Sequence, residues 1–569
     1  MRHARRFAVP VVCAALPLLV LAPLLGRGFT LNYDMVFAPR HSLLPDSLGL
    51  GSALPRSVPA DAVVAMATTV LPGDLLQQLL LAAALFAGPL GAARLVPTDS
   101  VGVRVVAALA YGWSAYVAER LFLGHWPYLL AYACLPWIAA AGLAVRRREP
   151  KALAALVVAC APAVLTPSGG LIAAVLAMVC AGPRALRATV PIAVVLNAPW
   201  WLPAVLQPTG ALSTADGVTA FAARGENWGG TVTSLLGLGG VWNAEVVPDS
   251  RANPVLPLLI LAMVAIAVVG LRVLAGEWGT GPALGVVALG AAGVLLAALA
   301  SVPVGADLLA WTVSHVPGGG LLRDSQKWVA WWALPLALGF ALGAGAAARV
   351  LRTRVARVAL LVAAAVFPVA LLPDLAFAGL GRLAAVDYPH DWADVRAVLG
   401  SDERPGDVVA LPFGAFRQFG WNGDRTQLDP APRVLPRPTV VDDTLFVGGR
   451  AVAGEDPRAA QVRAALEEGA ELAPLGIGWV LVERGTPGRV DPATLTGMTR
   501  EYDGDWLTLY RVPGRVVEPG TAGAPRAPVL VADGFALAII VGGLLWLALP
   551  VGRVASLGSR LRGVAPWPN

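Results

Sequence analysis

Twelve apolar stretches, each close to the length needed to cross a lipid bilayer, occupy most of this 569-residue chain. A membrane-spanning helix needs about 20 predominantly apolar residues. Only 14% of the residues are charged, against roughly 25% in soluble domains. These features predict an α-helical polytopic membrane protein with about 12 transmembrane helices. The candidate segments are 8–26, 74–93, 102–119, 127–145, 152–168, 170–183, 188–206, 254–275, 281–301, 328–348, 358–376 and 528–550.

Basic residues gather at every second end of these segments, which is the pattern of cytoplasmic loops in membrane proteins. With twelve spans every basic cluster falls on the side of both termini, whereas eleven or thirteen spans would break this agreement. We therefore expect a multi-pass protein of the plasma (inner) membrane with both termini cytoplasmic. The first segment resembles a secretory signal, but its long apolar run and poor cleavage site favour a retained anchor. The basic positions are Arg2, Arg5, Arg6, Arg94, Arg104, Arg146, Arg147, Arg148, Lys151, Arg184, Arg187, Arg272, Arg349, Arg352, Arg354, Arg357, Arg553, Arg560 and Arg562.

This topology divides the chain into a membrane part and one large polar insert. Residues 1–378 hold about 11 spans, residues 379–527 form an extracytoplasmic domain, 528–550 is the last transmembrane helix, and 551–569 is a cytoplasmic tail. The other long outer loops are 27–73, 207–253 and 302–327. The insert holds 21 of the 37 acidic residues against 16 Arg, so the basic excess belongs to the inner loops and gives no reason to invoke nucleic acid.

The insert has the pattern of a small α/β domain. Helical character is expected near 391–399 and 461–469, and strands near 407–413, 477–483 and 506–512. The stretch 421–450, rich in Pro, Arg and Asp, is interpreted as a solvated loop, with sugar binding as the alternative.

Asp34 lies in the first outer loop, within about eight residues of the end of the first segment. A carboxylate held at the membrane surface is able to act as a general base. The alternative is a structural role, in which Asp34 stabilises a turn or pairs with Arg40 or Arg56.

The loop at 302–327 ends in Arg323, Asp324 and Lys327, and Lys327 is one of only two lysines in the chain. Two cations at the outer membrane surface suit a phosphate group, because Arg offers a planar fork of donors and Lys a point charge. The alternative is an Arg–Asp pair beside a lysine that extends to the membrane surface.

Glu119, Arg120 and His125 cluster between the third and fourth segments. Either Glu119 and Arg120 form an internal salt bridge, or the group contacts a substrate. The five His residues show no paired spacing typical of a metal site, and the four Cys residues all lie in apolar segments. No phosphate-binding loop or nucleotide-binding glycine motif is present.

These residues, in this order, resemble the GT-C-type polyprenyl-phosphate-dependent glycosyltransferases, above all the large actinobacterial arabinofuranosyltransferases and their uncharacterised membrane relatives. The resemblance covers roughly residues 1–380. It rests on Asp34, on Tyr111-Gly-Trp-Ser-Ala-Tyr-Val-Ala-Glu-Arg120 with Gly124-His125-Trp126 and Leu135-Pro136-Trp137, and on Arg323-Asp324-x-x-Lys327-Trp328 leading into Leu334-Pro335. The chain departs from the large enzymes in lacking a long C-terminal carbohydrate-binding extension.

The resemblance implies a sugar donor carried on a polyprenyl phosphate and a cell-envelope glycan as acceptor, with membrane lipids around the spans. Asp34 would be the catalytic base and Arg323 and Lys327 would hold the donor phosphate. The substrate-positioning residues would be Glu119, Arg120, His125 and Asp324. No cofactor is required, although some relatives use a divalent cation. The alternatives are a non-catalytic GT-C-like scaffold or envelope-assembly factor and, as a third class, a solute transporter.

Overall fold

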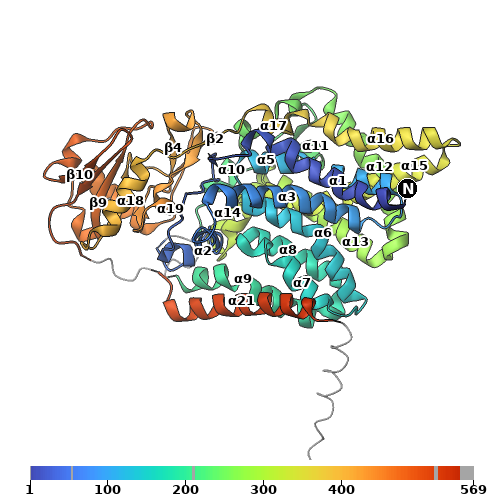
Figure 1. Cartoon of the computed structure of the whole chain (residues 1–569), viewed down its shortest axis with the longest axis horizontal. Helices are drawn as coiled ribbons and strands as arrows, with labels where there is room; N and C mark the ends of the chain where they lie inside the picture. The colour runs from blue at the N-terminus through green and yellow to red at the C-terminus, as the bar shows by residue number, and fades with distance from the viewer. Residues whose placement is uncertain (1, 53–54, 208–211, 518–522, 551–569) are drawn as a thin grey trace, which may run out of the picture.

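The computed structural model describes residues 2–52, 55–207, 212–517 and 523–550. Within these ranges ten helical segments are long and apolar enough to cross a membrane. They pack side by side as one bundle, with the sheet-containing insert at one end (Figure 1). The helices concerned are α1 (Arg2–Leu21), α3 (Gly73–Leu95), α4 (Val101–Gly112) with α5 (Ala115–Phe122), α6 (Trp126–Arg146), α9 (Leu186–Leu206), α12 (Leu256–Trp278), α13 (Thr280–Leu299), α15 (Ala330–Val350), α16 (Arg354–Leu371) and α21 (Arg526–Ala548). The predicted tail 551–569 lies outside the described residues.

The two remaining predicted spans form a short helical hairpin. Its arms are α7 (Ala152–Cys160) with the following short turn, and α8 (Pro167–Ala181). Runs of about 15 residues are shorter than the roughly 30 Å hydrocarbon core requires. By length the described residues therefore contain ten spans rather than twelve. The α7–α8 hairpin begins and ends at the same end of the bundle. The side of the membrane on which each later helix ends is therefore the same whether the hairpin crosses the membrane or not.

Shorter helices lie in the loops between the spans. These are α2 (Ala60–Ala67), α10 (Asp216–Ala220), α11 (Gly230–Leu236), α14 (Pro303–His315) and α17 (Ala376–Leu380), with a 3-10 turn at Ser325–Val329 that leads into α15. Figure 1 shows α2, α10 and α14 near the insert, and residues of α2, α10 and the 3-10 turn before α15 line the cavity described below.

α15 lies at the centre of the bundle and is almost completely buried. It packs against α4, α12, α13 and α16. The contact with α12 is the closest, since a Cβ added to Gly270 would collide with the Gly339 carbonyl oxygen and the Gly343 nitrogen. Small residues allow this approach between helix backbones in membranes.

The insert contains a five-stranded mixed sheet between two helices. Its strand order is β10-β11-β9-β3-β6; β3 runs parallel to β6 and β9, and β11 is antiparallel to both of its neighbours. The two predicted helices and three predicted strands lie at the expected positions, as α18 (Asp391–Ser401), α20 (Pro457–Glu468), β3 (Asp407–Leu411), β9 (Ile477–Glu483) and β11 (Leu507–Arg511). The sheet also contains β6 (Thr439–Val440) and β10 (Thr499–Asp503), which were not predicted.

Alternation along the central strands explains why a helix covers each face. Val408 and Ala410 pack with residues of α18, whereas Val409 and Leu411 pack with residues of α20. Successive side chains of a strand point to opposite faces, so the apolar run of β3 is buried on both sides.

The stretch 421–450 is not the solvated loop that its composition predicts. β4 (Phe416–Gln418) and β5 (Thr426–Leu428) form a hairpin, and a second hairpin joins β7 (Leu445–Val447) to β8 (Arg450–Val452). Asn422, Gln427 and Asp429 are buried. The prediction was wrong because this stretch packs against the first outer loop of the membrane part, and the composition of the stretch does not reveal such a contact.

We expect Gly270→Ala to destabilise the bundle, because the new methyl group meets backbone atoms of α15. Overpacking of a close contact costs about 1–3 kcal/mol. Gly276→Ala, on the same helix but with open space around it, is the matched control. Thermal unfolding of the purified protein in detergent measures both, and equal midpoints for the two variants would argue against the close α12–α15 contact.

Candidate functional site

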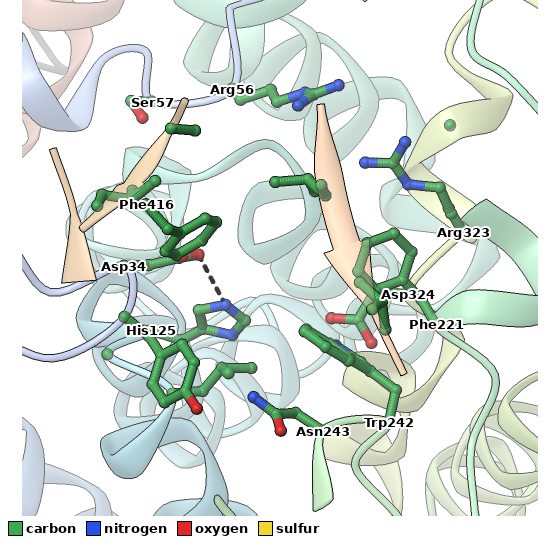
Figure 2. A pocket seen from close by; sticks show the side chains of 18 of the residues that line it. Asp34, Arg56, Ser57, His125, Phe221, Trp242, Asn243, Arg323, Asp324 and Phe416 are labelled. Atoms are coloured by element: carbon green, nitrogen blue, oxygen red, sulfur yellow. Dashed lines mark hydrogen bonds and ion pairs between the residues drawn. The ribbon is translucent and has the colours of Figure 1, made fainter. Parts of the chain in front are cut away.

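A cavity of about 1200 Å³ lies between the helix bundle and the insert. Its walls come from the first outer loop, the link between α5 and α6, the tip of the α7–α8 hairpin, the loop before α15, and the β4–β5 and β7–β8 hairpins. Figure 2 shows Asp34 and His125 on one side of the cavity and Arg56 and Arg323 on the other. The structure thus brings together five predicted site residues: Asp34, His125, Arg323, Asp324 and Lys327.

The Asp34 loop is clamped between two parts of the fold. The Asp34 N–H donates to the carbonyl of Leu123 at 3.2 Å, and Tyr33 has a left-handed φ of 44°. The N–H of Tyr33 donates to the Thr426 carbonyl at 2.6 Å, and the N–H of Leu428 donates to the Tyr33 carbonyl at 2.8 Å. The loop therefore adds to the edge of the β4–β5 hairpin, so the insert helps to fix Asp34.

The α5–α6 link approaches the Asp34 loop closely at Gly124. This glycine has a φ of 75°, and a Cβ there would collide with backbone atoms of Asn32 and Met35. Such a position requires glycine both for its backbone angle and for its space. Because Gly124 lies so close to the Asp34 loop, the next residue, His125, lies beside Asp34.

His125 joins Asp34 to Arg120. Its Nε2 lies 3.0 Å from Oδ2 of Asp34, and its Nδ1 lies 2.8 Å from Nη1 of Arg120. A guanidinium only donates, so Nδ1 must accept and Nε2 carries the proton that is donated to Asp34. This arrangement assigns His125 the neutral Nε2–H tautomer. Within the described ranges, Oδ1 of Asp34 has no hydrogen-bond partner, and the side chain is 46% exposed to the cavity.

Arg120 is fully buried, and the same Nη1 also donates to Oδ2 of Asp324 at 2.9 Å. Its Nη2 donates to the side chain of Gln326. Burial alone would raise the pKa of Asp324, but the positive charges of Arg120 and Lys327 outweigh this effect and lower the pKa to about 2. The ion pair of Arg120 is therefore with Asp324, not with its sequence neighbour Glu119.

Glu119 lies behind the cavity wall and does not line it. Its Oε2 accepts from the Val241 N–H at 3.3 Å and from Nε2 of Gln326 at 3.4 Å. Gln326 thus connects Glu119 to Arg120. Both Glu119 and Arg120 are placed to support the residues that line the cavity rather than to touch a ligand themselves.

A second charged group faces Asp34 across the cavity. Arg323 pairs with Glu455 of the insert at 3.0 Å, and Arg56 contacts the same carboxylate. Burial, together with the neighbouring charge of Arg56, lowers the pKa of Arg323 to about 10, so it stays positively charged at neutral pH. Two guanidinium groups thus share one carboxylate, and the carboxylate of Asp443 also acts on both of them.

The Lys327 side chain is almost buried, and its Nζ lies 5.9 Å from the centre of the Tyr128 ring. Among the described residues its ammonium group has no hydrogen-bond or ion-pair partner. Lys327 lines the cavity, and its charge also acts on the nearby Asp324 carboxylate, whose pKa it helps to lower.

Sequence reasoning missed Glu455, Arg56 as its partner, and Phe416. Phe416 forms an aromatic wall with Phe221 and Trp242, both from the loop 207–253. Phe221 stacks under the guanidinium of Arg323, 4.9 Å from the ring centre. The loop 207–253 gave a signal through its Trp and Asn content. Glu455 gave none, because nothing in its local sequence distinguishes it from other surface acids.

Within the described residues no three His, Cys, Asp or Glu side chains come close enough together to hold a metal ion. Asp34 is bonded to His125 and Asp324 to Arg120. These two carboxylates of the cavity wall are thus bonded to different side chains.

The chain resembles a solved membrane enzyme in fold. Arabinofuranosyltransferase AftD from Mycobacteria, determined by single-particle electron cryo-microscopy, aligns with a TM-score of 0.56 and 17% identity over 90% of this chain. Two structures of a single-substitution mutant of AftD align with TM-scores of 0.55 and 0.53. The chain spans about 40% of the length of that protein. No protein-family model and no curated protein match the sequence.

The ten long apolar helices, the polar insert at one end and this structural similarity define a polytopic membrane protein with a GT-C-like fold. One protein that shares this fold at a TM-score above one half, AftD, is an arabinofuranosyltransferase. The similarity extends to the fold; the chemistry must be argued from the cavity.

The buried Arg120–Asp324 pair makes a testable contribution to stability. Because the pKa of Asp324 falls from its usual 3.8 to about 2 on folding, the pair's contribution is complete above about pH 4 and is lost as the pH drops towards 2. Asp324→Asn leaves Arg120 buried without its partner, which costs about 3–5 kcal/mol at neutral pH. Unfolding in detergent as a function of pH measures both effects.

Asp99→Asn is the control, because Asp99 forms an exposed pair with Arg104 at 3.8 Å and its loss should change stability by less than about 1 kcal/mol. Identical acid sensitivity of the wild type and Asp324→Asn between pH 4 and 2 would contradict the assigned ion pair.

Proposed function

We propose that this protein is an integral membrane glycosyltransferase that moves a sugar from a polyprenyl-phosphate donor to a cell-envelope glycan on the outer side of the plasma membrane. One observation carries the proposal. Asp34, whose Oδ1 has no hydrogen-bond partner among the described residues, shares a cavity with Lys327, whose side chain is almost buried. A base and an anion site in one cavity are what transfer from a phosphate leaving group to a hydroxyl requires.

Asp34 acts as the general base. Oδ2 is held by the Nε2–H of His125, which leaves Oδ1 to accept the proton of the acceptor hydroxyl. As the oxygen of the acceptor hydroxyl bonds to the anomeric carbon of the sugar, the bond from this carbon to the phosphate oxygen breaks. The electron pair stays on the polyprenyl phosphate, and the proton ends on Asp34.

The phosphate occupies the wall formed by Lys327 and Arg323. Lys327 supplies a point charge and Arg323 a fork of donors. Because Arg56 also pairs with Glu455, this carboxylate neutralises Arg323 only in part. Negative charge that develops on the leaving oxygen is stabilised by these fixed cations in a partly water-excluded site. In this arrangement the cations of the protein stabilise the leaving group, and no nucleotide-binding motif is needed.

The apolar part of the cavity suits the lipid chain of the donor. Trp200 and Ala204 of α9 and Leu165 at the hairpin tip line it, and all three belong to helical segments of the bundle. The glycan acceptor enters from the insert, where the exposed Phe446 of the β7–β8 hairpin offers a ring on which a sugar can stack. By analogy with AftD we propose arabinofuranose as a candidate for the transferred sugar.

Asp34→Asn should abolish most of the transfer activity, because an amide cannot take the proton of the acceptor. General base catalysis contributes about 10²–10⁴-fold, and the kcat of transfer from a polyprenyl-phosphate sugar in proteoliposomes should fall by that factor. Asp46→Asn, in the same loop but outside the cavity, should retain activity. If Asp34→Asn supports normal envelope composition in cells while deletion of the protein alters it, the protein is a non-catalytic assembly factor.

Lys327→Met should reduce kcat by about 10²–10³-fold, which is the usual loss for one donor to a developing oxyanion. Lys327→Arg keeps the charge and should retain more activity than Lys327→Met. Steady-state kinetics with a lipid-linked sugar donor provide the comparison. Equal losses in both variants would show that the lysine contributes packing rather than charge.

A further inference from the structure

A second cavity, of about 720 Å³, lies at the other end of the bundle, away from the insert. It is formed where α6 ends, α7 begins, α8 ends and α21 ends. Trp546, in the last turn of α21, is twenty residues beyond the start of that helix at Arg526, which corresponds to about 30 Å. Figure 1 shows that α21 starts beside the insert and ends at the opposite end of the bundle, near α7.

Four cations and one acid line this basic pocket, which we define by Arg146, Arg148, Glu149, Lys151 and Arg184. Glu149 is paired with Arg147 outside the pocket at 2.8 Å. Within the described ranges the side chains of Arg148 and Arg184 have no hydrogen-bond or ion-pair partner. The pocket therefore carries positive charge that its own residues leave uncompensated.

Two of the cations are held in place by helix ends. Arg146 donates through Nε to the Cys180 carbonyl at 2.7 Å and through Nη2 to the Val179 carbonyl at 2.8 Å, in the last turn of α8. Lys151 donates to the carbonyl of Leu547 at 2.9 Å, near the end of α21. Cations are favoured at helix C-termini by the unsatisfied carbonyls and the helix dipole.

The backbone is shaped around these two side chains. Gly182 has a φ of 81°, and a Cβ there would lie 2.7 Å from Nη2 of Arg146, so only glycine fits. Arg148 and Lys151 themselves have left-handed φ values of 57° and 63°. The loop thus turns sharply twice and directs its cations towards the same space.

The remaining lining is apolar. Leu153, Ala154 and Ala181 come from the helix ends, and the ring of Trp546 closes one side. Trp is the side chain typical of the boundary between the hydrocarbon and the head groups. A ligand that fits both halves of the pocket has an anionic head and an apolar tail.

We propose that this basic pocket binds the phosphate head group of an anionic phospholipid. Basic pockets between transmembrane helices bind such head groups, with both charge and apolar contact contributing. Free phosphate would leave the apolar lining unused, and an acidic protein surface would not reach between the helix ends. The site is separate from the cavity of the proposed transfer reaction and does not depend on that proposal.

Native mass spectrometry of the full chain in detergent tests this proposal. Titration with phosphatidylglycerol should show binding at least about tenfold tighter than binding of phosphatidylcholine. The double variant Arg148→Ser/Arg184→Ser should lose about tenfold or more of the phosphatidylglycerol affinity, since each cation near a lipid surface contributes on the order of fivefold. Arg352→Ser/Arg354→Ser is the matched control and should bind as the wild type does; both residues are exposed, Arg352 in the loop after α15 and Arg354 at the start of α16.

Three results would overturn the proposal. Equal binding of the two lipids would show that no head-group site exists, and equal loss in both double variants would show general surface attraction. Complete displacement of phosphatidylglycerol by millimolar inorganic phosphate would identify a free-anion site. If Arg148→Ser/Arg184→Ser does not fold, Arg184→Ser alone replaces it, because that exposed side chain supports no contact in the described residues; binding unchanged in that variant would equally count against the proposal.

Discussion

The guanidinium of Arg120 is the interaction on which the candidate site depends. Its Nη1 holds both Asp324 and His125, and His125 in turn holds Asp34. A buried charge must be paired, so the position of Arg120 dictates where Asp324 lies and which tautomer His125 adopts. Two carboxylates of the cavity wall, Asp324 directly and Asp34 through His125, are thereby held by one side chain that does not itself line the cavity.

The insert contributes to the same site in two ways. Its β4–β5 hairpin pairs with the backbone at Tyr33, and Glu455 draws Arg56 and Arg323 together. The first contact positions the proposed base, and the second keeps two like charges at the same wall. An insert that only captured a glycan would require neither contact, so it is better described as a structural half of the cavity than as an attached binding module.

The sequence was sufficient for ten of the twelve predicted spans and for three strands of the sheet, because hydrophobic length and period-two alternation are local signals. It also singled out Asp34, His125 and Lys327, which the fold brings to one cavity. It did not separate the residues that line the cavity from Arg120 and Glu119, which lie behind the wall, because burial is a property of packing between distant segments. The partners of Asp34 and Arg323 were missed for the same reason: each pairs across at least 90 residues of chain.

The α7–α8 hairpin links the orientation of the protein to its chemistry. Its tip, at Leu165, Thr166 and Pro167, lines the candidate site, and its base lines the basic pocket. The two cavities therefore lie at opposite ends of one short structural unit. Positive charge favours the cytoplasmic side, so an orientation with the basic pocket inside places the candidate site at the outer face. Because the hairpin starts and ends at the same side, this argument is the same for ten spans as for twelve, and it supports an outer-face reaction independently of the residues proposed to carry it out.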